Sequence, residues 1–191
     1  MPTIRKRKPP KTALLNAVKK NDLAEVRLIL EAGSDPNAAD KRGGGWTPLH
    51  WACWYGFTEI VRSLLKHGAG IEDKTVFGWT PLYFACRSNA TEIVKLLLSH
   101  DADPNPKDSF HERSILCEIC EHIHPPRSGI ARILLQAGAS MTEDEARRFL
   151  DVTVCLPAIN PDRELLLEWY REHHPEMFME RFCTENVPPG M

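Results

Sequence analysis

The side chains best suited to bind a metal ion lie in one short segment, residues 117–124. Cys117 and Cys120 have the Cys-x2-Cys spacing of zinc sites, and His122 and His124 follow closely. The same segment reads as a helix, and cysteines three residues apart on a helix share one face, so the simpler interpretation places both in the core. Eight consecutive helical residues also surround an ion poorly, because His122 points away from Cys120. We therefore expect no metal site and no cofactor.

No other arrangement of residues predicts catalysis. The sequence contains no Gly-x-Ser-x-Gly nucleophile elbow, no glycine-rich phosphate loop and no His-Glu-x-x-His motif. The adjacent acids Asp144 and Glu145 have a structural explanation, since carboxylates in the first turn of a helix are stabilised by its dipole. We expect a protein that is not an enzyme and has no catalytic residues.

The charge of the chain is unevenly distributed. The 191 residues carry a formal net charge of -2. Five of the 24 basic side chains lie in residues 1–11, which hold none of the 26 acidic ones, so the remainder carries a net charge of -7. An acidic body argues against nucleic-acid binding by the folded part.

The sequence predicts neither a membrane protein nor a secreted one. No apolar run is long enough for a transmembrane helix, and no apolar segment follows the basic N-terminus as in a signal peptide. Six scattered cysteines without a signal peptide indicate reduced thiols. We expect a cytoplasmic or nuclear protein with no membrane contact.

One phrase of the sequence occurs twice, 33 residues apart. Residues 45–52 (GWTPLHWA) return as residues 78–85 (GWTPLYFA), and each copy is followed by Thr-Glu-Ile-Val and then Leu-Leu. A period of this length indicates stacked supersecondary units, which build an extended surface in place of a closed catalytic pocket.

The first copy carries the signals of a short pair of helices. Thr47 is placed to cap a helix, Pro48 to occupy its first position, and Leu49 to begin its apolar stripe. Gly56 fits the end of this helix, where positive φ is common. Residues 60–65 then have the apolar spacing of a second helix.

This unit resembles the ankyrin repeat. The Thr-Pro-Leu-His phrase, the following Ala and Gly, Glu-Ile-Val, Leu-Leu and the closing Gly-Ala all fall in register. The resemblance implies an all-α ankyrin-repeat solenoid of about five helix-turn-helix repeats, the last two diverged. It also implies a non-catalytic scaffold or adaptor that binds another protein.

Weaker copies extend the array in both directions. A first repeat fits residues 14–33, and the loop after it is two residues longer than expected, so its tip should be mobile. In the third repeat Asn89 replaces the usual Gly and still tolerates positive φ. A fourth repeat fits residues 113–139, without Thr-Pro and with Glu118 where Ala is usual, so its second helix is better defined than its first.

The end of the chain reads as a diverged terminal repeat. Thr142 and Glu145 form a capping box that opens a helix through Val152, and Asn160-Pro161 opens another. We expect a basic disordered tail over residues 1–11, ankyrin repeats over 12–174, and a C-terminal tail with a short helix over 175–191. The expected repeat boundaries are 12–45, 46–78, 79–112, 113–141 and 142–174.

In ankyrin-like domains the variable contact positions lie on the loop tips and on the exposed side of each first helix. Carried over residue by residue, the resemblance implies a partner-binding site on the concave face and loop tips of repeats one to three, at Arg42, Trp46, Trp54, Tyr55, Phe77, Trp79, Arg87 and Phe110. Tryptophan and tyrosine often carry binding energy. The alternative for Trp46 and Trp79 is that their rings pack on neighbouring loops. We expect a monomeric chain whose partner segment has mixed charge, because Arg42 and Arg87 join an otherwise acidic body.

Two alternative functions stay open. In the first, residues 142–191 dock the chain to a larger assembly such as a ubiquitin ligase, so that it acts as an adaptor subunit. In the second, Trp46, Trp51 and Phe84 resemble the aromatic cage with which ankyrin repeats of certain histone-lysine methyltransferases hold methylated lysine. Trp54 replaces the acid expected beside that cage.

The basic tail also has alternative interpretations. Arg5–Lys8 have the clustered charge of a nuclear-import signal. The same residues could contact phosphate or anionic lipid, or serve as a disordered, solubilising end.

Overall fold

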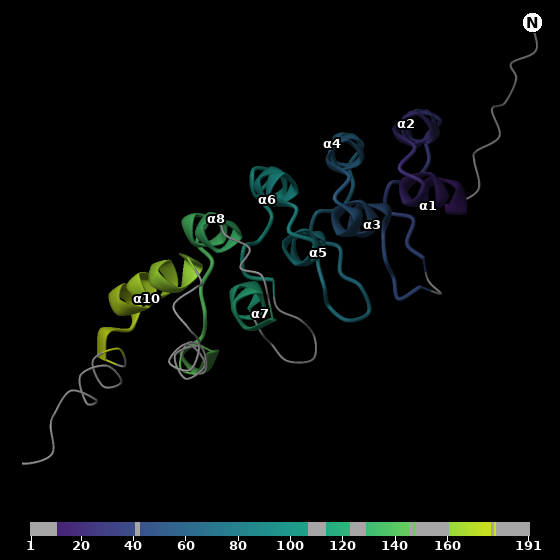
Figure 1. Cartoon of the computed structure of the whole chain (residues 1–191). Helices are drawn as coiled ribbons and strands as arrows, with labels where there is room; N and C mark the ends of the chain where they lie inside the picture. The colour runs from purple at the N-terminus through teal and green to yellow at the C-terminus, as the bar shows by residue number, and fades with distance from the viewer. Residues whose placement is uncertain are drawn as a thin grey trace, which may run out of the picture. The chain divides into compact units, whose positions relative to one another are not determined.

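A computed structural model of the chain describes the residues that form most of the repeats (Figure 1). The described residues are 11–40, 43–106, 114–122, 129–145, 147, 161–176 and 178. Within these ranges the chain is helical with no strand, apart from one isolated bridge between Asp40 and Trp46. The chain divides into two compact units, residues 1–112 and residues 113–191.

The first unit contains three pairs of short helices. They are α1 (Lys11–Lys19) with α2 (Leu23–Glu31), α3 (Pro48–Tyr55) with α4 (Thr58–Lys66), and α5 (Pro81–Arg87) with α6 (Thr91–Leu98). The first helices form one layer, in which α3 packs against both α1 and α5, and the second helices form the other, in which α4 packs against α2 and α6 (Figure 1). The fold is therefore the all-α repeat stack that the 33-residue period predicts.

The local signals in the sequence act as expected. Thr47 caps α3, where its Oγ1 accepts a hydrogen bond from the His50 N–H at 3.4 Å, and Pro48 follows at the first helical position. Gly56 ends α3 with φ of 75°. Asn89 occupies the matching position after α5 with φ of 58°, as its tolerance of positive φ predicts.

Aliphatic side chains from both layers form the core of the first unit. The completely or almost completely buried ones include Leu49, Ile60, Leu64, Leu82, Ile93 and Leu97. Burying such a side chain stabilises the fold by about 1.5–3 kcal/mol. Ala52 and Ala85 are also fully buried, and their small size lets the first helices of successive repeats pack closely.

The loops between repeats are hydrogen-bonded hairpins. In the first loop the Asp40 N–H donates to the Trp46 carbonyl at 2.9 Å, and in the second the Thr75 N–H donates to the Trp79 carbonyl at 3.0 Å. The Val76 N–H donates to the Gly44 carbonyl at 3.0 Å and so joins one loop to the next. Lys41 and Arg42, which lengthen the first loop, lie outside the described residues.

The second unit contains further helices of the same kind. They are α7 (Ile115–His122), α8 (Ile130–Gln136) and α10 (Pro161–His173), with helical backbone also at 143–145. Both helices of the fourth repeat therefore form. Ser114 takes the place of the missing Thr, since its Oγ accepts a hydrogen bond from the Cys117 N–H at 3.2 Å. Helix α8 packs against both α7 and α10.

The expected capping box at Thr142 is present and has an additional contact. The Thr142 N–H donates to a Glu145 carboxylate oxygen at 2.8 Å, and the Glu145 N–H donates to Thr142 Oγ1 at 3.3 Å. The same carboxylate accepts a hydrogen bond from the Ser114 N–H. Glu145 is buried, so it ties the start of its own helix to the start of the fourth repeat.

Several expectations fall on residues that the structure does not describe. They include residues 1–10 of the basic tail, Phe110 at the third loop tip, the end of the helix predicted through Val152, and most of the C-terminal tail. Lys11, which was expected in the basic tail, begins α1. The repeat boundaries stay predictions. No helix in the described part of the chain is both long and apolar enough to cross a bilayer.

Candidate protein-binding face

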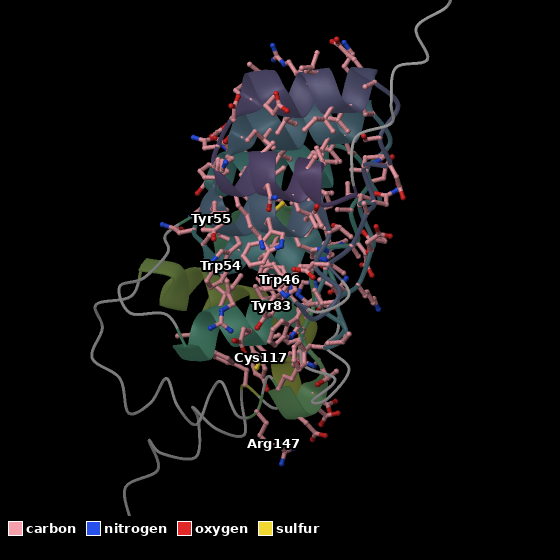
Figure 2. The ribbon with its side chains drawn as sticks, turned by 90° about the vertical axis from the view of Figure 1, so that its right-hand side faces the viewer. Trp46, Trp54, Tyr55, Tyr83, Cys117 and Arg147 are labelled. Atoms are coloured by element: carbon pink, nitrogen blue, oxygen red, sulfur yellow. The ribbon has the colours of Figure 1, made fainter. Side chains whose placement is uncertain are left out.

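The first unit gathers nine aromatic side chains into one cluster. We call this the aromatic cluster, and its members come from α3, α5, the turn after α3 and the loops before α3 and α5. The aromatic cluster consists of Trp46, Trp51, Trp54, Tyr55, Phe57, Phe77, Trp79, Tyr83 and Phe84. Figure 2 views the first unit from the end that carries α1 and α2, and Tyr55, Trp54, Trp46 and Tyr83 of this cluster are labelled in it.

Trp46 lies at the centre of the aromatic cluster. Its ring centroid is 4.5 Å from that of Trp51 and 4.1 Å from that of Phe84 in the next repeat. Trp54 meets the Trp46 ring edge-to-face at 6.2 Å and the Phe84 ring edge-to-face at 5.9 Å. Edge-to-face pairs at such distances are attractive beyond the area that they bury. The ring of Trp46 therefore packs against side chains of two successive repeats.

The third repeat copies part of this arrangement. Trp79 stacks on Tyr83 with centroids 5.3 Å apart, and Phe77 lies 4.9 Å from Trp79. Phe84 contacts Trp79 edge-to-face at 5.7 Å. Because Trp46 and Trp79 are both half-buried in these contacts, packing accounts for much of their role. This supports the alternative in which the two rings stiffen the stack.

Two pairs of apolar side chains extend from the packed rings into solvent. Trp54 and Tyr55, at the end of α3, are 39% and 46% exposed, and Val76 and Phe77, in the following loop, are 63% and 39% exposed. We call these four residues the exposed apolar pairs. Val76 is absent from the predicted site residues, although its position at the tip of the loop could have indicated that it belongs there. Exposed groups of large apolar side chains are typical of interaction sites.

His50 fixes the backbone beneath the aromatic cluster. Its Nδ1 accepts a hydrogen bond from the Thr47 N–H at 3.1 Å, which leaves Nε2 as the donor. The Nε2–H reaches the carbonyl oxygens of Asp73 at 3.0 Å and Trp79 at 3.1 Å. His50 therefore links α3 to the loop that carries Val76 and Phe77.

The environment of His50 keeps the ring neutral. Burial lowers the pKa of His50 from 6.5 to about 4, because a charged imidazolium is poorly solvated there, and the carbonyls of Trp79 and Asp73 oppose this shift only in part. Burial also raises the pKa of the Cys53 thiol, with Cys86 acting in the same direction. A buried thiol of this kind is unreactive.

Two cations contact the aromatic cluster. Lys19 Nζ lies 4.0 Å from the centre of the Trp51 ring, in cation–π geometry. Arg87 Nη1 donates a hydrogen bond to Tyr83 Oη at 3.1 Å. Arg87, a predicted site residue, is exposed at the end of α5. The cluster therefore presents both apolar and positively charged groups.

The geometry does not favour a methyl-lysine cage at Trp46, Trp51 and Phe84. A cage surrounds an ammonium group with separated rings. Here the Trp46 ring contacts both other rings directly, and the ammonium group of Lys19 occupies a face of Trp51.

The described residues contain no group of three or more side chains that could hold a metal ion. Cys117 is buried on α7, as the interpretation of a core cysteine requires. The side chains of Cys120 and His122, and the whole of His124, lie outside the described residues.

The fold defines a class of proteins built from stacked pairs of helices. The sequence pattern described as "Ankyrin repeats (3 copies)" matches residues 14–108 and again 68–145, so the chain belongs to the ankyrin-repeat family. Ankyrin repeats generally bind other proteins and are typically non-catalytic.

Similarity to individual proteins is confined to the repeats. The chain is 47% identical over 58 residues to the mouse (Mus musculus) 2-5A-dependent ribonuclease, covering 30% of this chain and 8% of that protein. It is 36% identical over 72 residues to the human ankyrin repeat domain-containing protein 40, covering 38% and 19%. It is 42% identical over 70 residues to the bovine (Bos taurus) ankyrin repeat domain-containing protein 49, covering 36% and 29%. The chain spans less than a third of the length of each.

Proposed function

We propose that this chain is a non-catalytic adaptor that binds a partner protein through the exposed apolar pairs. The observation that carries the proposal is the exposure of Trp54, Tyr55, Val76 and Phe77 above a packed aromatic support. The rings beneath them are held by direct contacts across two repeats. The exposed side chains are therefore pre-positioned, which lowers the entropic cost of binding.

The proposal divides the predicted site residues by role. Trp54, Tyr55 and Phe77 are placed to contact the partner, while Trp46 and Trp79 support them from half-buried positions. Large aromatic anchors that become buried in an interface often contribute about 2 kcal/mol or more each.

A pull-down from a lysate of the source cells tests the function, with bound proteins quantified by mass spectrometry. The test variant is Trp54→Ala/Tyr55→Ala. The matched control is Leu28→Ala, because Leu28 is a 61% exposed apolar residue of α2 in the other helix layer. We expect a protein retained by the wild type and by the control and lost by the test variant. Equal retention by all three would contradict the proposal, provided circular dichroism shows that each is folded.

A further inference from the structure

We propose that the partner presents an acidic peptide segment, which lies across the C-terminal ends of α1, α3 and α5. This inference rests on the protein-binding function proposed above and adds the chemistry of the partner. The sequence alone led us to expect a partner segment of mixed charge, whereas the segment proposed here is negatively charged.

The ends of the three helices lie side by side. Ser88 Oγ, just after α5, donates a hydrogen bond to the Cys53 carbonyl of α3 at 2.9 Å. Lys19, the last residue of α1, places its ammonium group 4.0 Å from the Trp51 ring of α3. One extended segment could therefore contact all three ends at once.

The charged side chains on this layer have one sign. The first helices and the turns that follow them occupy residues 11–21, 47–57 and 80–90, and these segments contain no aspartate or glutamate. Exposed cations lie at two of the helix ends: Lys19 and Lys20 at the end of α1, and Arg87 at the end of α5. Between them, Trp54 and Tyr55 end α3. Carbonyl groups at helix C-termini carry partial negative charge that disfavours an anion, so the attraction must come from these cationic side chains.

Two carboxylates at the start of the second helices are paired with a cation of their own helix, Glu59 with Arg62 at 3.5 Å and Glu92 with Lys95 at 3.3 Å. Asp22 and Glu25 are exposed and keep their charge, and they belong to the N-terminus of α2, in the other helix layer. Neither Lys19 nor Lys20 pairs with a carboxylate in the part of the chain that the structure describes.

The arrangement also sets the spacing of the partner's charges. Packed helices lie about 8–10 Å apart, so the ends of α1 and α5 are separated by roughly 16–20 Å. An extended peptide advances about 3.3 Å per residue and covers this span in about five or six residues. The segment that fits has carboxylates near both ends and an apolar side chain between them, above Trp54 and Tyr55. A cationic segment would be repelled at both ends.

Selection of binders from a displayed random peptide library, with the full chain as bait, tests this inference. The charge-reversal variant is Lys19→Glu/Lys20→Glu, and its matched control is Arg27→Glu/Lys66→Glu, which reverses two exposed cations of α2 and α4. Because Lys19 contacts Trp51, Lys20→Glu alone serves as a milder variant, and circular dichroism verifies folding. Affinities are then measured by fluorescence polarisation with the selected peptides, dye-labelled.

We expect selected peptides rich in Asp and Glu around a large apolar residue. Their affinity should fall about tenfold or more in the charge-reversal variant, less in Lys20→Glu, and little in the control. Peptides that depend on Trp54 and Tyr55 but lack acidic residues, or ignore the charge reversal, overturn the acidic partner and leave the proposed function standing. Peptides that bind Trp54→Ala/Tyr55→Ala as well as the wild type, or no selected peptide at all, count against both.

Discussion

Protonation of His50 should destabilise the fold, and the size of the effect follows from its environment. His50 is fully buried, its pKa is lowered to about 4 in the folded chain, and its ordinary value is 6.5. Below pH 6.5 the unfolded chain binds a proton that the folded chain rejects, so stability falls as the pH decreases. This contribution is fully present above pH 6.5. The loss is about 2 kcal/mol at pH 5 and reaches about 3 kcal/mol below pH 4.

Urea unfolding followed by tryptophan fluorescence, at pH 7.5 and pH 5, measures this loss. The comparison variant is His50→Gln, which keeps a hydrogen-bonding side chain that does not titrate. Its loss between the two pH values should be about 2 kcal/mol smaller than that of the wild type. Burial raises the pKa of Asp73, with Asp35 adding to the shift, and this gives the opposite pH dependence. Both proteins contain Asp73, so its contribution cancels when the pH dependence of the variant is subtracted from that of the wild type. Equal pH dependence in the two proteins would refute the reasoning.

Further substitutions test the packing of the rings and the hydrogen bond of a buried carboxylate. Trp46→Ala should lower the free energy of unfolding by about 3 kcal/mol, because it removes the central ring of the aromatic cluster. Trp54→Ala should lower it by about 1 kcal/mol, because this side chain is more exposed. Similar losses for the two variants in thermal or urea unfolding would contradict their different roles. Glu145→Ala should cost about 1–3 kcal/mol, since it leaves the buried Ser114 N–H without its acceptor. Hydrogen exchange at the Ser114 amide should quicken in Glu145→Ala far more than in Glu145→Gln, and no change would argue that this contact is unimportant.

Much of the fold could be predicted because its signals are local and repeated. Thr47 and Thr80 cap helices through residues three positions ahead, and Gly56 and Asn89 each adopt the positive φ that ends a first helix. These interactions involve neighbours in sequence, and the 33-residue period supplies each of them twice. Even in the diverged end, the Thr142 capping box was recognisable for this reason.

Contacts between repeats were harder to predict. Asn37 Oδ1 accepts a hydrogen bond from the Gly70 N–H at 2.7 Å. At the equivalent place one repeat later, a Glu72 carboxylate oxygen accepts a hydrogen bond from the Asp103 N–H at 2.9 Å. An amide and a carboxylate therefore make the same contact between successive repeats. The second partner of Glu145 likewise comes from a distant segment, as Ser114 lies 31 residues away. Such contacts depend on how the repeats stack, which no short pattern in the sequence encodes.

The places of the candidate site residues in the fold could be predicted, whereas their division into supporting and exposed rings could not. Register placed Trp46, Trp54, Phe77 and Trp79 on the loops and first helices, where the structure has them. It could not divide them into supporting and exposed rings, because that depends on side-chain contacts such as the one between Trp46 and Phe84. Lys19 gave no signal either, since its contact with Trp51 joins different repeats.

Photo-crosslinking tests the central claim of partner binding at the exposed apolar pairs most directly. p-Benzoylphenylalanine would replace Tyr55 at the end of α3 in one protein and the exposed Leu28 of α2 in another, and both would be irradiated in the source cells. A covalent adduct with a partner protein from position 55 and none from position 28 is the predicted result. An adduct from position 28 alone, equal adducts from both, or none from position 55 would contradict a partner-binding face at the end of α3.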